Sequence, residues 1–107
     1  MASGKAKSAS WTLIGSVTGS TAVTIPPDVS ELIIEARYTT SAIHFNFPLC
    51  IAQLSNTAIL FNAGYDNGRS ATCICQISAS SASVHLNALW INGTDYTSTS
   101  SIRVFGK

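Results

Sequence analysis

The feature that most constrains the fold of this chain is an alternation of apolar and polar residues with a period of two. The clearest run lies between Glu31 and Thr39, where every second residue is apolar: Leu32, Ile34, Ala36 and Tyr38. Side chains in a β-strand point alternately to opposite faces of the sheet, so this pattern is typical of a strand with one buried face. No stretch of ten or more residues has a convincing helical period. The sequence therefore predicts an all-β fold.

Two further runs place specific residues in the expected core. One face carries Ala71, Cys73, Cys75 and Ile77, and another carries Val84, Leu86, Ala88 and Trp90. Cys73 and Cys75 are two residues apart on one face of a strand, about 7 Å from each other, which would strain a disulfide between them. We expect both cysteines to be small core residues, and we expect Trp90 and Tyr38 to lie in the core, Tyr38 with a subunit interface as the alternative.

Turn residues separate these runs. Pro26-Pro27-Asp28 interrupts the chain, and Asp66-Asn67-Gly68 and Asn92-Gly93 supply the positive φ angles of tight hairpins. About eight strands are predicted, near 10–17, 20–25, 31–39, 43–53, 58–63, 69–79, 83–91 and 99–105. Short strands at regular spacing indicate an antiparallel β-sandwich, jelly-roll-like in kind. We expect residues 10–107 to form one such domain and residues 1–9 to be a flexible N-terminal tail.

The composition excludes several classes of protein. A chain of 107 residues is too short for a large multidomain enzyme, and 46% hydrophobic residues with a net charge of +1 argue against disorder. The six Lys and Arg residues are scattered, which disfavours nucleic acid as a partner, and no apolar run is long enough for membrane insertion. Only 10% of residues are charged, whereas 16 are Ser and 11 are Thr. Low charge favours a homo-oligomer, with a monomer as the alternative.

Candidate catalytic and metal-binding groups are few. Glu31 and Glu35 would lie about 13 Å apart along a strand, too far for an acid/base pair. His44 and His85 each stand alone in a strand, without the neighbouring His or Cys that a metal site uses. We therefore expect no enzymatic activity, no catalytic residues, no metal and no cofactor.

Four segments resemble a known domain: 11–19 (WTLIGSVTG), 23–35 (VTIPPDVSELIIE), 45–48 (FNFP) and 101–106 (SIRVFG). They are similar to a widespread domain at the C-terminal ends of phage and prophage tail, baseplate and tail-fibre proteins. The resemblance implies a β-sandwich head in a virion tail or fibre, made in the bacterial host cytoplasm. It implies a homotrimer that contacts other virion tail components and a host cell-surface receptor, a glycan or a protein. It assigns no receptor-contact residues.

Two loops combine the aromatic and hydrogen-bonding side chains with which proteins commonly bind saccharides. The first contains Tyr65, Asp66, Asn67 and Arg69, and the second contains Trp90, Asn92, Asp95 and Tyr96, with a core position as the favoured interpretation of Trp90. These residues are the candidate receptor-binding site, although turn formation alone also explains the Asp-Asn-Gly sequence. Two alternatives stay open: a purely structural or decoration virion protein without receptor binding, and a carbohydrate-binding module or small hydrolase outside any virus.

Overall fold

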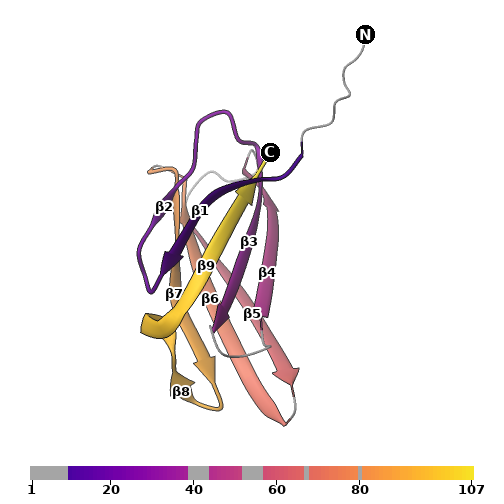
Figure 1. The fold of residues 1–107 in the computed structure, drawn as a ribbon, viewed down its shortest axis with the longest axis vertical. Coiled ribbons are helices and arrows are strands. Elements are labelled where there is room, and N and C mark those ends of the chain that lie inside the picture. Colours follow the sequence, from indigo (N-terminus) through magenta and orange to yellow (C-terminus); the bar gives the residue numbers. More distant parts are fainter. Residues whose placement is uncertain (1–9, 39–43, 52–56, 67, 80) are drawn as a thin grey trace.

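The computed structural model describes residues 10–38, 44–51, 57–66, 68–79 and 81–107, and within them nine strands form two antiparallel sheets. The sheets pack face to face (Figure 1), which confirms the predicted all-β antiparallel sandwich. The expectations for residues 1–9, 39–43 and 52–56 lie outside the described residues.

The first sheet contains both the first and the last strand of the chain. Its four strands, in order across the sheet, are β1 (Thr12–Thr18), β9 (Ser100–Gly106), β3 (Glu31–Tyr38) and β4 (His44–Cys50). The last strand lies between the first and the third and is antiparallel to both. This insertion is the jelly-roll-like part of the topology, and it makes the sheet depend on pairings between distant parts of the chain.

The second sheet contains five strands and is mostly local in sequence. Its order is β2 (Val23–Thr24), β7 (Ser83–Ile91), β6 (Arg69–Ser78) and β5 (Ala58–Asp66), and the short β8 (Thr94–Asp95) also pairs with β7. Hairpins connect β5 to β6 and β6 to β7 (Figure 1). β8 and the 3₁₀ turn η2 (Thr97–Thr99) occupy a stretch for which the sequence predicted no element.

The core lies between the sheets and receives alternate side chains from both. Residues that are completely buried include Leu32, Ile34, Leu86, Leu89 and Ile102. Cys73 and Cys75 are also completely buried and are free thiols, as predicted. The hydrogen bond with Cys75, together with burial, raises the pKa of the Cys73 thiol far above its ordinary value. Because both thiols are completely buried, they behave as small apolar side chains rather than as nucleophiles.

A β-bulge in β7 changes which of its residues face the core. Ile74 of β6 is opposite Ala88, whereas the next residue, Cys75, is opposite Leu86, so Asn87 is an extra residue in β7. The insertion shifts the alternation by one position. Leu89 is buried in consequence. The expectation that Trp90 lies in the core is therefore wrong: its side chain is 43% exposed on the outer face of the sheet.

The tight turn after β7 was predicted correctly. Asn92 has φ 50° and Gly93 has φ 78°, so both central residues are left-handed, as in the turn type that suits the twist of a two-residue hairpin. Gly68, between β5 and β6, also has a positive φ of 76°. Asparagine and glycine tolerate this conformation better than other residues, which is why the sequence pattern was sufficient here.

The bulge makes a prediction about stability. We expect Leu89→Ala to lower the free energy of unfolding by about 2–5 kcal/mol, because it deletes a completely buried side chain and leaves a cavity. Trp90→Ala should cost less than half as much, since Trp90 is outside the core. Chemical denaturation of both variants measures the difference. A straight β7 would bury Trp90 instead, so the opposite order of effects would contradict the bulge.

Candidate functional site

The structure brings the two predicted loops together at one end of the five-stranded sheet. The backbone N–H of Asn92 donates to the carbonyl oxygen of Ser70 at 2.8 Å, and the N–H of Ser70 donates to Asn92 Oδ1 at 2.9 Å. The β5–β6 hairpin and the β7–β8 turn therefore end side by side (Figure 1). Of the first loop, the half-buried Arg69 is described, whereas Asn67 and the side chains of Tyr65 and Asp66 lie outside the described residues.

Asp95 forms part of a hydrogen-bonded turn. Both the N–H and the hydroxyl of Thr97 donate to Asp95 Oδ1, and the same hydroxyl oxygen accepts the N–H of Leu89 at 3.0 Å. The bonds from Thr97 lower the pKa of the Asp95 carboxyl, first through its hydroxyl and then through its backbone. The Asp95 carboxylate therefore holds the chain that follows β8.

Tyr96 is placed by packing rather than presented to solvent. Its ring lies against that of Tyr38, with centroids 4.4 Å apart and planes tilted by 36°, and both rings are partly buried against the core. The completely buried Ser100 donates its hydroxyl to the Tyr96 carbonyl at 2.6 Å. The predicted ligand-binding role of Tyr96 thus competes with a structural one, in which it anchors the start of β9.

Trp90 supplies the exposed aromatic surface at this end of the molecule. It lies opposite Thr72 of β6 on one side and opposite Asp95 of β8 on the other, so the three side chains share the outer face of the sheet. A shallow hollow of about 400 Å³ adjoins it, lined by Ser70, Thr72, Ile74, Trp90 and Gly93. We call this feature the Trp90 hollow. It combines an indole, two hydroxyls and, at its border, an ionised carboxylate.

Sequence reasoning missed the exposure of Trp90 because it continued the alternation from Val84 without a break. A signal was present, since Leu86 and Leu89 are three residues apart and cannot both face inward from a regular strand. A bulge between them is the local solution that buries both leucines. The same bulge turns Trp90 outward and creates the hollow.

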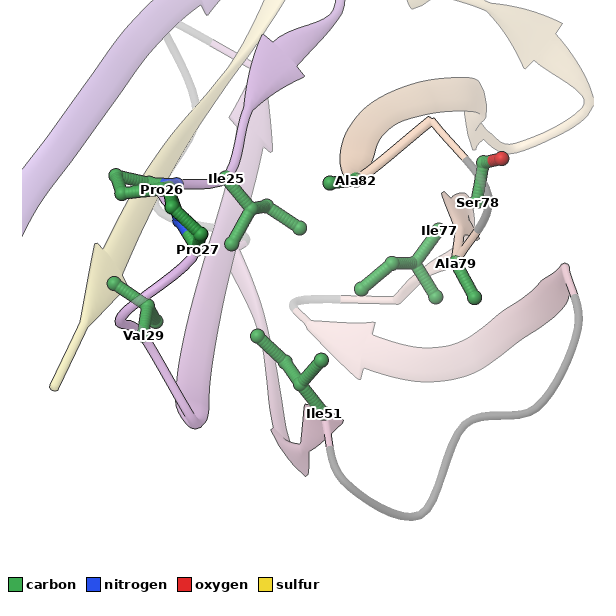
Figure 2. Close-up of a pocket in the computed structure, with 9 residues that line it drawn as sticks. All are labelled: Ile25, Pro26, Pro27, Val29, Ile51, Ile77, Ser78, Ala79 and Ala82. Atoms are coloured by element: carbon green, nitrogen blue, oxygen red, sulfur yellow. The ribbon is translucent and has the colours of Figure 1, made fainter.

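A second hollow lies at the opposite end, between the two sheets. It has a volume of about 240 Å³, and the side chains around it are mostly apolar (Figure 2); it is lined by Ile25, Pro26, Pro27, Val29, Ile51, Ile77, Ser78, Ala79 and Ala82. Ile51 and Ala79 each precede residues outside the described part of the chain. Ser78 is the one polar side chain in the lining, so the hollow lacks the convergent polar groups that orient a ligand.

The outer face of the four-stranded sheet carries an ion pair beside a row of apolar side chains that includes the 52% exposed Leu13 and, opposite it, Phe105. Arg103 forms an ion pair with Glu35, with its Nε donating to Oε1 at 2.7 Å, and its guanidinium carbon lies 5.4 Å from the ring centre of Phe105. Within the described ranges, no three His, Cys, Asp or Glu side chains are grouped to hold a metal ion. The same ranges contain no helix long and apolar enough to cross a membrane.

The Thr97 hydrogen bonds predict how Asp95 titrates. Because the folded-state pKa is lowered, the bonds contribute stability above the unfolded pKa of about 3.9, and this contribution is lost as the pH falls through the folded value. We expect Thr97→Val to return the pKa toward the ordinary value and Thr97→Ser to keep it low. NMR titration of the Asp95 carboxyl carbon measures both. An ordinary pKa in the unsubstituted protein would contradict the geometry.

Comparisons with known proteins assign no function to this chain. The chain was compared with protein-family models, with curated proteins and with solved structures, and none of the three comparisons gives a match.

Proposed function

We propose that the chain is the head domain of a phage-type tail or fibre and that it binds a saccharide of the host cell surface at the Trp90 hollow. The observation that carries the proposal is the position of Trp90: a large aromatic ring, 43% exposed, on a strand that is hydrogen-bonded on both sides. The resemblance in segments 11–19, 23–35, 45–48 and 101–106 supports the viral context.

An exposed indole on a rigid strand suits a sugar ring. The C–H-bearing face of a pyranose is apolar and packs on an aromatic face, which removes apolar surface of both partners from water. Because β6 and β8 flank Trp90 in the sheet, the backbone on which its ring is carried is ordered before the ligand arrives. The entropic cost of binding is lower for such a preorganised site.

Polar groups at the rim would orient the hydroxyls of a sugar. Ser70 and Thr72 line the hollow with hydroxyl groups that both donate and accept. Asp95 lies beside Trp90 in the neighbouring strand, and its ionised carboxylate is a hydrogen-bond acceptor. Among the described side chains it is the single carboxylate next to the hollow, whereas glycoside hydrolysis uses a pair. The arrangement therefore favours binding over hydrolysis.

Tryptophan fluorescence tests this proposal directly. The chain has two tryptophans, so the conservative substitution Trp11→Phe leaves Trp90 as the single indole reporter. We expect titration of this variant with bacterial surface saccharides to change the Trp90 emission and saturate. Trp90→Ala should weaken saccharide binding at least tenfold, which is a loss of about 1.4 kcal/mol in binding free energy. Calorimetric titration measures this loss.

Matched controls separate contact from folding. Thr72→Val keeps the size of the side chain and removes a hydroxyl at the hollow, and it should weaken binding, whereas Asn46→Ala on the outer face of the other sheet should have no effect. A purely structural or decoration protein would show no saturable response to any saccharide although it folds normally. That result would refute the receptor-binding proposal.

A further inference from the structure

Three of the four sheet margins carry a feature that disfavours pairing with another strand. β1 has a bulge between Leu13 and Gly15. β4 contains Pro48, which has no N–H to donate and occurs in edge strands with its nitrogen toward solvent. On the far side of β7 the margin is divided between β2 and β8, each two residues long. These are the usual ways in which proteins protect sheet edges.

The fourth margin, β5, has none of these protections. The strand is nine residues long, contains no proline and has no charged residue before Asp66 at its end. Its outward side chains Ile59 and Phe61 are 58% and 65% exposed. No strand in the described part of the chain pairs with the side of β5 that faces away from β6. A long, uncharged and apolar edge strand is a template for pairing with another strand.

One hydrogen bond of β5 shows which of its backbone groups face the free edge. The N–H of Ala63 donates to the side chain of Asn62 at 2.9 Å, which places this N–H on the side away from β6. Backbone groups in an antiparallel strand alternate between its two sides. Ile59, Phe61 and Ala63 therefore direct their N–H and C=O groups to the free edge, while the residues between them pair with β6. When another strand pairs here, the Ala63 N–H exchanges its bond to the Asn62 side chain for a bond to that strand.

We propose that β5 pairs antiparallel with β5 of a second copy of this chain, about a two-fold axis at Phe61. In this register Phe61 is opposite Phe61 of the second copy, and Ile59 is opposite Ala63. The two sheets become continuous, and outward side chains of one copy meet outward side chains of the other. Each opposed pair of edge-directed residues exchanges two backbone hydrogen bonds, and the aromatic cross-strand pair adds to them.

A second copy suits this edge better than a partner of different chemistry. The strand is uncharged from Ala58 to Tyr65, so two copies can approach without like-charge repulsion, and the chain carries a net charge of only +1. In a symmetric contact, the exposed β5 edge of each copy covers the exposed β5 edge of the other. The Trp90 hollow stays open, because Trp90 lies on β7, which β6 separates from β5.

The size of the contact predicts a dimer that dissociates on dilution. Nine residues at about 3.4 Å each make an edge about 31 Å long. Such an edge buries on the order of 500 Å² per copy, near the lower limit for specific interfaces. Two-fold pairing gives two copies, whereas the resemblance to tail domains implies three. The inference goes beyond saccharide binding and does not depend on it.

Light scattering on a sizing column, over a range of protein concentrations, tests the pairing. We expect twice the mass of the 11.2 kDa chain at high concentration and the single mass on dilution. Phe61→Lys should abolish the dimer by placing a charge at its centre. Ala63→Pro should also abolish it, because it removes an edge-directed N–H and leaves the bonds to β6 in place. Asn46→Lys, on the edge strand β4, is the matched control and should remain dimeric.

Circular dichroism and thermal unfolding check that each variant is folded. If Phe61→Lys does not fold, Ala63→Pro tests the pairing instead. Several results would overturn the inference: a monomer at every concentration, a three-copy mass, or a dimer that survives Ala63→Pro. A dimer sensitive to Phe61→Lys alone would depend on packing of the sheet face rather than on the strand edge. The mass of the protein can be measured whether or not it binds a saccharide. A failure of the dimer proposal is therefore distinguishable from a failure of the saccharide-binding proposal.

Discussion

A β-strand can bury only every second side chain, and the whole sandwich depends on satisfying this constraint in both sheets at once. β3 and β9 meet it without interruption, with Leu32, Ile34, Ile102 and Val104 completely buried. β7 cannot, because its apolar residues change phase between Leu86 and Leu89. The bulge at Asn87 resolves the conflict by adding one residue to the strand.

The bulge connects the core to the candidate site. It turns Trp90 outward, and Leu89, next to Trp90, uses its backbone in the turn that follows β8: its N–H donates to Thr97, and its carbonyl accepts the N–H of Tyr96. Thr97 in turn holds Asp95 beside Trp90. The indole and the carboxylate are therefore positioned by bonds that also stabilise the fold, which gives the proposed saccharide site a rigid base.

Some of the candidate binding residues already contact other residues of the chain, and others face solvent. Asn92 and Tyr96 are engaged with Ser70 and Tyr38, so their main contribution is to hold the loops in place. Trp90, Thr72 and Asp95 share an outward row across the sheet. On the neighbouring strand β5, the exposed Ile59 and Phe61 form a separate apolar margin. One sheet thus offers a polar aromatic hollow and an unprotected edge, which suit two different kinds of partner.

The sequence alone determined the fold class, most strand positions, the burial of Cys73 and Cys75, and the turn at Asn92 and Gly93, because alternation and turn preference are local properties. It also identified two loops that the structure brings together. The tertiary structure decided the order of the strands, the outward position of Trp90 and the exposed edge of β5. These depend on which strand lies beside which and on where a ladder gains one residue, and pairing partners far apart in the chain settle both.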